Sequence, residues 1–190
     1  MSADLSRIAP SDASYVENRN LDAESVTDRE MQLSEKYTDV GDLLDPADVE
    51  FIRIYGETLK KEPEPARDRG TARADFNRAG SGAGGSGQMY GSMSLYTQDF
   101  TWNNSYSFSV TAVAKTSNVQ KIKNCASVRA YGTVGAGGVG IVYTSDPCAT
   151  VNGTYHNMSR NQPYSAFVVY ATIVVTSTFY TPSGSFQVSS

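Results

Sequence analysis

The feature that most constrains the fold of this chain is a series of strand patterns that runs from Met89 to the C-terminus. Small hydroxylated residues alternate there with aromatic and aliphatic ones, as in residues 106–114, where every second side chain is apolar. Such period-two alternation is typical of half-buried strands. No helical pattern interrupts the series. About six to eight strands of this kind predict an antiparallel β-sandwich or barrel of about 100 residues.

The longest apolar run in the chain, residues 166–180, is apolar on both faces and lies between Pro163 and Pro182. A strand with two apolar faces belongs in the centre of a sandwich or in a subunit interface. Fully extended, residues 164–181 would span roughly 60 Å at about 3.3 Å per residue, which is longer than an ordinary strand. We therefore expect a bulge or a bend within this run.

The charges divide the chain into two parts. Residues 1–78 contain 18 acidic and 11 basic residues, whereas residues 79–190 contain 2 acidic and 5 basic residues. A contrast this strong indicates a change of structural class. Two prolines, an arginine-rich run and a Gly/Ser run lie between the parts, and such runs behave as flexible linkers. We predict an acidic segment over residues 1–62, a linker over residues 63–87 and the antiparallel β domain over residues 88–190.

Short helices are predicted within the acidic segment. Residues 1–20 lack periodicity and are expected to be disordered. Ser25 and Asp28 have the spacing of a capping box, which indicates the start of a first helix. A second helix is expected over residues 46–61, since Pro46 fits the first helical turn.

One side of this second helix forms an apolar stripe of Val49, Ile52, Tyr55 and Leu59. Two short helices bury too little apolar surface to be stable alone, so the stripe must pack against something. It packs on the β domain of the same chain, or it docks on a partner, or it belongs to a removable pro-segment. A membrane surface is disfavoured, because the polar face of the helix is acidic and anionic lipids would repel it.

The two cysteines, Cys125 and Cys148, form a candidate disulfide, with Cys125 in a strand and Cys148 in a polar loop. An even cysteine count in a β-rich domain favours a disulfide in an oxidising compartment. The alternative is a pair of unrelated thiols in a cytosolic protein.

Few residues could support catalysis or hold a cofactor. His156 is the only histidine and is predicted to lie in an exposed loop. The alternative is an enzyme in which His156 acts as the base and Cys148 as the nucleophile. Gly135, Gly137 and Gly140 satisfy a dinucleotide-binding pattern, but strand-like residues follow where a helix is needed, so we predict a hairpin tip. Zinc needs three or four ligands in fitting spacing, which are absent. We expect no catalytic residues, no cofactor and no metal site.

Aromatic residues are the strongest candidates for a binding surface. Nine of the 12 tyrosines lie at or beyond Tyr90, and a first cluster comprises Tyr90, Tyr96, Phe100, Trp102 and Tyr106. Surface aromatics stack on sugars or bases, or anchor protein interfaces. The alternative is cross-strand packing within the sheet. The candidate interface or ligand aromatics are Tyr96, Trp102, Tyr155, Tyr164 and Tyr170.

These observations predict a non-enzymatic structural or interaction protein. Its β domain would assemble with copies of itself or bind a surface ligand, and the acidic segment would dock on a partner or guard the domain. The alternative is a secreted pore-forming toxin with a pro-segment, which is the one hypothesis that involves a membrane. Five basic residues in residues 79–190 make no nucleic-acid footprint, so the expected partner is the chain itself or another protein. We expect an extracellular or particle-associated location. The start of the chain lacks the apolar core of a signal peptide, so the export route is not predicted and a cytoplasmic location stays open.

Overall fold

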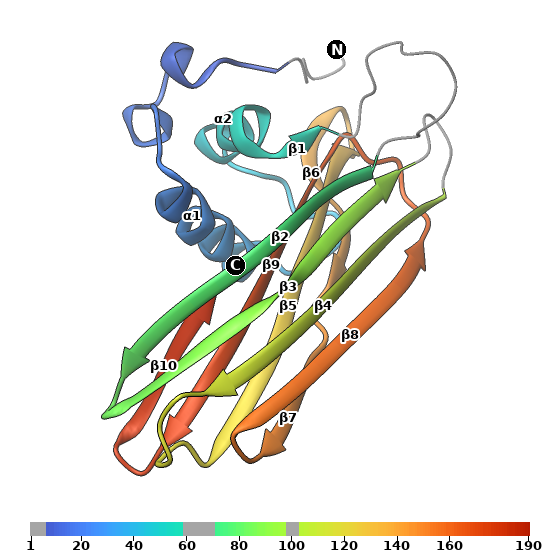
Figure 1. The fold of residues 1–190 in the computed structure, drawn as a ribbon. Coiled ribbons are helices and arrows are strands. Elements are labelled where there is room, and N and C mark those ends of the chain that lie inside the picture. The colour runs from blue at the N-terminus through green and yellow to red at the C-terminus, as the bar shows by residue number, and fades with distance from the viewer. Residues whose placement is uncertain (1–6, 59–70, 98–102) are drawn as a thin grey trace.

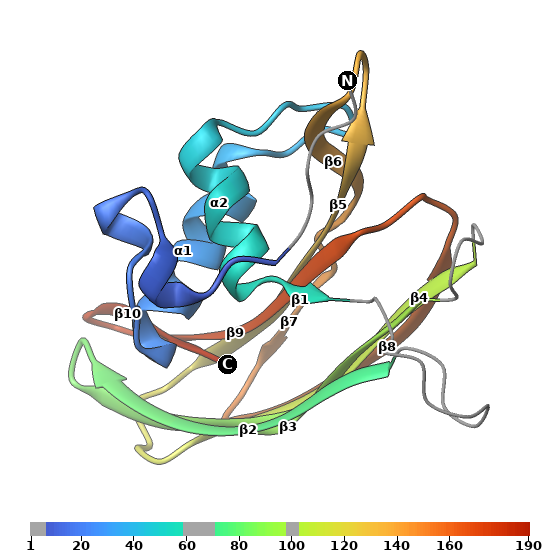
Figure 2. The ribbon, with the colours of Figure 1, turned by 90° about the horizontal axis from the view of Figure 1, so that it is seen from above.

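The computed structural model describes residues 7–58, 71–97 and 103–190. Two antiparallel sheets face each other across a core, and the helices of the N-terminal part lie against the outer side of one sheet (Figure 1, Figure 2). The predicted class is confirmed: the chain is mainly β, with an antiparallel sandwich preceded by a short helical part.

The front sheet of Figure 1 contains β2 (Thr71–Gly82), β3 (Gly85–Thr97), β4 (Asn104–Ala114) and β8 (Tyr155–Tyr164), paired in that order. Every neighbouring pair is antiparallel. Buried and less buried side chains alternate along β4 from Asn104 to Val110. One side of the front sheet therefore faces the core and the other faces outward.

The back sheet is built around β5 (Lys121–Val134) and β9 (Tyr170–Thr181), which pair with each other. The second side of β9 pairs with β1 (Glu57–Thr58) and β10 (Gly184–Ser189), and the second side of β5 pairs with β6 (Gly138–Ser145) and β7 (Cys148–Asn152). β9 lies in the middle of this sheet, which confirms the central position predicted from its two apolar faces.

The apolar run over residues 166–180 is not one strand. β8 ends at Tyr164 in the front sheet and β9 begins at Tyr170 in the back sheet, so the residues between them cross from one sheet to the other. Asn104 Nδ2 donates to the carbonyl of Ala166 at 2.8 Å, and the amide of Val169 donates to the carbonyl of Tyr131 at 2.8 Å. The chain therefore turns where the sequence predicted a bulge or bend.

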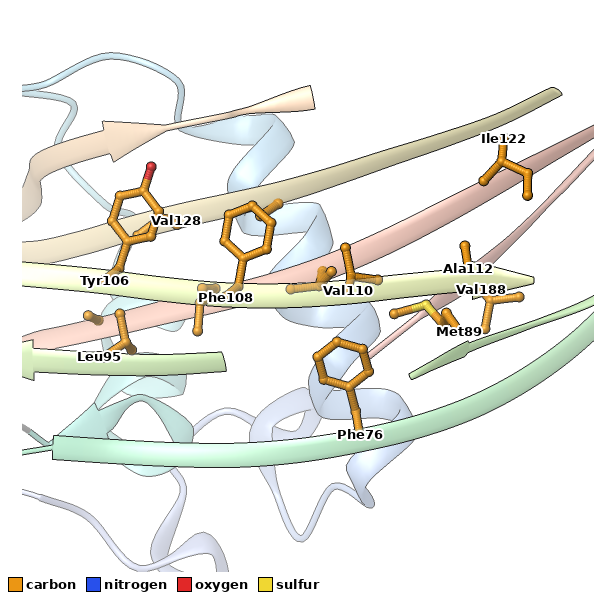
Figure 3. Close-up of a cluster of buried hydrophobic side chains, with 14 of the residues drawn as sticks. Phe76, Met89, Leu95, Tyr106, Phe108, Val110, Ala112, Ile122, Val128 and Val188 are labelled. Atoms are coloured by element: carbon orange, nitrogen blue, oxygen red, sulfur yellow. The ribbon is translucent and has the colours of Figure 1, made fainter. Parts of the chain in front are cut away.

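The main core lies between the two sheets. Figure 3 shows Tyr106, Phe108, Val110 and Ala112 projecting from β4 into this space, where Val128 and Ile122 come from the back sheet. All of these side chains are buried. The removal of so much apolar surface from water is the main force that stabilises a sandwich of two sheets.

A helical layer covers the outer side of part of the back sheet (Figure 2). It consists of two short 3₁₀ turns, η1 (Pro10–Asp12) and η2 (Val16–Asn18), and the helices α1 (Ala23–Lys36) and α2 (Pro46–Tyr55). A second apolar cluster joins Leu33, Phe51 and Ile52 of the helices to residues of β5, β6 and β9. In the described part of the chain, neither helix has the length and apolar character that a membrane span requires.

Both predicted helices exist, but their ends differ from the prediction. The N-cap of α1 is Asp22, whose side chain accepts a hydrogen bond from the amide of Ser25 at 2.8 Å, so Ser25 is not the cap. α2 ends at Tyr55 because the chain leaves the helix at Gly56 and enters β1, which pairs with β9. Residues 59–61 of the predicted helix lie outside the described residues.

Asp48 is a buried charge in the helical layer, on α2. Its carboxylate accepts hydrogen bonds from Arg29 Nη2 at 2.5 Å, Lys36 Nζ at 2.7 Å and the Tyr37 hydroxyl at 2.8 Å. The bonds from Lys36 to Asp45 and Asp48 raise the pKa of that ammonium. A buried carboxylate with three donors satisfies the rule that buried charges are paired, and here it joins α2 to α1.

Residues 7–20 are also ordered, so the predicted disorder of residues 1–20 is wrong for this stretch; residues 1–6 lie outside the described part. The Glu50 carboxylate accepts hydrogen bonds from the amides of Ser14 at 2.7 Å and Tyr15 at 2.9 Å, and from Asn18 Nδ2 at 3.2 Å. Glu50 is buried in α2. Asn18 Nδ2 also donates to the carbonyl of Ala47 at 2.8 Å, and the amide of Ile8 donates to that of Arg53 at 3.3 Å. A segment without periodicity is thus held by polar contacts to α2, which composition does not reveal.

We predict that acid or the substitution Glu50→Gln detaches this N-terminal stretch. Burial alone raises the pKa of Glu50, but the bonds from Tyr15, Ser14 and Asn18 outweigh it and hold the pKa below its ordinary value. A group with a lowered pKa stabilises the fold above its unfolded-state pKa, and this contribution is lost as the pH falls through the folded-state value. Amide exchange of residues 14–18, taken relative to the intrinsic exchange rate at each pH, should therefore become faster on acidification below about pH 4.5.

At neutral pH the Glu50→Gln variant should already show this faster exchange, with a loss of about 2 kcal/mol of local stability. The matched control is Glu35→Gln, since Glu35 is exposed on α1. Equal exchange at residues 14–18 in both variants would contradict the prediction.

The linker predicted over residues 63–87 is wrong from residue 71 onward, where β2 and β3 form a hairpin; residues 59–70 lie outside the described part. The glycines there let the two sheets approach. A Cβ added to Gly80 would lie 2.8 Å from Val188, one on Gly82 would lie 2.7 Å from Phe186, and one on Gly87 would lie 2.5 Å from Phe179. The Gly/Ser composition of a linker therefore belongs to a closely packed pair of strands.

Candidate functional site

The outer side of the front sheet is a surface built by several paired strands. Alternation along β3, β4 and β8, together with the pairing register, determines which side chains project there. We call this surface the open face. It comprises Ser86, Gln88, Tyr90, Ser92, Ser94 and Tyr96 of β3; Ser105, Ser107, Ser109, Thr111 and Val113 of β4; and Tyr155, Asn157, Ser159, Asn161 and Pro163 of β8.

Two exposed tyrosines stand on the open face. The side chain of Tyr90 is 42 % exposed and that of Tyr155 is 58 % exposed. Tyr90 pairs in register with Asn77 on one side and Thr111 on the other, and Thr111 pairs with Asn157. Tyr155 precedes Asn157 by two residues and therefore lies on the same side of β8. The two rings therefore rise from a patch of amides and hydroxyls.

Hydrogen bonds between neighbouring strands hold these polar groups in place. Gln88 Nε2 donates to Asn77 Oδ1 at 2.7 Å, and Asn157 Nδ2 donates to Thr111 Oγ1 at 2.8 Å. The hydroxyls of Ser94 and Ser107 are 2.7 Å apart. Side chains fixed in this way lose little rotational freedom when a ligand binds.

The open face carries no charged residue at any of its positions on β3, β4 and β8. On the edge strand β2, Arg73 and Asp75 lie opposite Ser94 and Ser92 and project to the same side of the sheet, where they pair with each other at 3.3 Å. An uncharged array of hydroxyls, amides and aromatic rings, bordered by one such ion pair, suits a neutral ligand rich in hydroxyls better than a polyanion, which needs several unpaired cations.

The predicted candidate aromatics do not gather at one site. Tyr96 is half-buried on the open face and Tyr155 is exposed there. Tyr164 is buried and stacks on Tyr143 with ring centroids 3.9 Å apart, and burial raises its pKa. Tyr170 is buried in the cluster beneath the helices. Tyr164 and Tyr170 are therefore core residues and not surface aromatics.

Trp102 lies outside the described residues. Tyr90, which the sequence placed in the first aromatic cluster without making it a candidate, is one of the two exposed rings on the open face. Its alternation with the buried Met89 is the signal that could have identified it.

The predicted docking helix is already covered. Ile52 is fully buried, and Val49 and Tyr55 pack against the cluster that joins the helices to the back sheet. The Tyr55 hydroxyl accepts from the amide of Leu21 at 2.8 Å and donates to the carbonyl of Asn18 at 2.9 Å. The stripe packs on the β domain of its own chain, which was one of the alternatives; Leu59 lies outside the described residues.

The candidate disulfide is present in the structure. Cys125 and Cys148 are joined with their Cα atoms 4.2 Å apart, and they oppose each other in the pairing of β5 with β7. Cys148 lies in a strand and not in the predicted loop. Because its sulfur is bonded to Cys125, it supplies no thiolate for the enzymatic alternative.

His156 lies in β8 and not in an exposed loop. Burial lowers its pKa, and its Nδ1 is buried without a hydrogen-bond partner among the described residues. No group of three or more His, Cys, Asp or Glu side chains suited to a metal occurs within residues 7–58, 71–97 and 103–190.

The glycine pattern forms the turn between β5 and β6, with Gly135 and Gly137 at positive φ, so the predicted hairpin tip is confirmed.

A groove of about 480 Å³ lies between α1 and the strands β2 and β10. Glu24 and Asp28 line it from α1, and Arg78 lines it from β2. Its lining also includes residues 187–190 and contains no aromatic side chain. It therefore lacks the stacking surface that the open face has.

No protein-family model and no curated protein matches this chain. The open face is the candidate site that its geometry defines.

Proposed function

We propose that this is a non-enzymatic interaction protein whose β domain binds a neutral polysaccharide through the open face. The observation that carries the proposal is the pair of exposed rings, Tyr90 and Tyr155, on an uncharged patch of fixed amides and hydroxyls. The C–H groups on one side of a sugar ring suit the negative face of an aromatic ring. The sugar hydroxyls both donate and accept hydrogen bonds, as amides and serine hydroxyls do.

The rest of the fold supports this role. The helical layer covers part of the outer side of the back sheet and leaves the open face uncovered (Figure 2). The helical part is thus a fixed cover of the β domain in this proposal, in place of a docking or guard segment. A disulfide favours an oxidising, extracellular or particle-associated location, where polysaccharides are abundant.

The pore-forming alternative requires apolar side chains on a lipid-facing surface. The buried apolar side chains of the described strands lie between the two sheets or beneath the helices, and the outer side of the front sheet is mostly polar. The sandwich would have to open before it could insert, and we do not propose this function.

The test is retention of the full chain on a panel of insoluble neutral polysaccharides, followed by affinity measurements on soluble fragments of any that binds. The variants Tyr90→Ala and Tyr155→Ala should each weaken binding at least about tenfold, as expected for aromatic hot spots. Tyr15→Ala is the matched control, because Tyr15 is exposed on the helical layer away from the open face.

Unfolding midpoints of the three variants should stay within a few degrees of the parent, since exposed side chains are removed. The proposal is wrong if no neutral polysaccharide retains the protein, or if both open-face variants bind as tightly as Tyr15→Ala.

A further inference from the structure

We propose that two copies of this chain associate through the edge strand β2, in an antiparallel register that brings Arg73 of each copy opposite Asp75 of the other. The front sheets of the two copies would then form one continuous sheet. This inference is independent of polysaccharide binding, because it concerns the edge of the front sheet and not its open face.

Within residues 7–58, 71–97 and 103–190, β2 is a long strand with one unpaired side. It ends the strand order of the front sheet, and among the described strands its 12 residues pair only with β3. Residues 73–75 and 77–79 are exposed, and Figure 1 shows β2 along the border of the sheet. Unpaired N–H and C=O groups along such an edge are a template for another strand.

The hairpin determines which backbone groups of β2 point away from β3. Ala83 and Gly84 form a two-residue turn, both with positive φ, and Gly82 pairs with Gly85. The closing pair of such a hairpin exchanges both hydrogen bonds, and bonded pairs then alternate along the strands. The even-numbered residues of β2 therefore bond to β3. The N–H and C=O groups of Arg73, Asp75 and Asn77 point to the open edge.

The charges on these odd-numbered residues select one register. With a two-fold axis at Ala74, Arg73 of each copy opposes Asp75 of the other, and opposite charges directly across a strand pair are favourable. A shift of the axis by one residue toward either end pairs Arg73 with itself or Asp75 with itself, which is unfavourable. Residues 71–77 of both copies then form roughly eight backbone hydrogen bonds, two for each odd-numbered pair.

Two other edges in the described structure, those of β6 and β8, are less suited to this pairing. The outer side of β6 is occupied, because Gly41 donates to Ile141, Ile141 donates to Asp42, and Leu44 donates to Val139. The opposite edge of the front sheet, β8, contains Pro163, which lacks a donor, and a single charged residue, Arg160. Two β8 strands would thus have no pair of opposite charges to set their register.

In the paired sheet both open faces lie on the same side, because opposed residues of neighbouring strands share a face. The dimer would present two open faces to one surface. Two linked sites bind a repetitive ligand more tightly than one site does.

Sedimentation velocity and light scattering of the full chain test the proposal over about 5 to about 500 μM, a range suited to a small interface. The parent should approach twice the 20.5 kDa of one chain as the concentration rises. Asp75→Arg and Arg73→Asp should each stay monomeric, because each opposes like charges. An equimolar mixture of the two variants should form heterodimers, and the doubly swapped chain Arg73→Asp/Asp75→Arg should dimerise like the parent.

Asn161→Arg on β8 is the matched control, since it adds a charge to the opposite edge of the front sheet and should leave dimerisation unchanged. Circular dichroism melts establish that every variant is folded. A monomeric parent at the highest concentration overturns the proposal. So does a folded Asp75→Arg variant that dimerises like the parent, or a mixture of the two single variants that fails to associate.

Discussion

Replacing Arg129 by Met is expected to loosen the helical layer from the back sheet and to lower the free energy of unfolding by about 3–5 kcal/mol. Arg129 lies in β5 with its side chain only 3 % exposed. Its guanidinium donates to the carbonyls of Ser34 at 2.7 Å and Tyr37 at 3.1 Å, and to Asp146 Oδ1 at 2.8 Å. One side chain thus connects the sheet to the end of α1.

The position of these bonds explains the size of the effect. Ser34 is in the last turn of α1 and Tyr37 is its C-cap, so both carbonyls lie at the negative end of the helix, where a cation is favourable. Methionine fills a similar volume but donates no hydrogen bond. It leaves buried carbonyls unpaired and deprives Asp146 of its cation, and each buried unpaired group costs about 1–3 kcal/mol.

Chemical denaturation measures the loss, and amide exchange identifies where it acts. Exchange of residues 23–55 should accelerate more than that of β4, since the contact belongs to the helical layer. Arg160→Met is the matched control, because Arg160 is exposed on β8 and its removal should change stability by less than about 0.5 kcal/mol. Equal denaturation midpoints for the two variants would show that Arg129 does not hold the layer.

The sequence predicted the elements whose periodicity is regular. Ser105, Ser107 and Ser109 alternate with Tyr106 and Phe108, and this pattern alone indicates both a strand and the polar side that became part of the open face. The cysteine pair was predictable for a similar reason, since two cysteines in a β-rich domain have few other uses. In both cases the signal depends on local spacing and residue type.

The failures occurred where distant contacts decide the structure. Gly80, Gly82 and Gly87 have a linker composition, yet they lie in strands because Val188, Phe186 and Phe179 occupy the space above them. Tyr170 looks like a surface aromatic until the helices are seen to cover it. Local pattern does not encode which segment packs on which, so these residues could be assigned only from the three-dimensional structure.

Replacing Gly91 by Ala is expected to be at least as damaging as the loss of Arg129, with about 3–5 kcal/mol of lost stability and a melting temperature lower by roughly 10–15 °C. Gly91 is in the middle of β3, between Phe76 of β2 and Val110 of β4. A Cβ added there would overlap the carbonyl oxygen of Ser109 and would lie 3.0 Å from Phe76 Cζ. An aromatic ring beside a strand glycine compensates for the missing side chain.

The contrast with Gly87 makes this prediction specific. The three atoms nearest to a Cβ on Gly87 would all belong to the ring of Phe179, at 2.5–2.9 Å, and a side chain can shift where a strand backbone cannot. Gly87→Ala should therefore cost about 1–3 kcal/mol, less than Gly91→Ala. Ser92→Ala, one residue along β3 and on the open face, should be nearly neutral. Thermal and urea unfolding of the three variants measure the order of their stabilities. A Gly91→Ala variant as stable as Ser92→Ala would contradict the prediction, because it would mean that β3 and β4 can move apart without loss of stability.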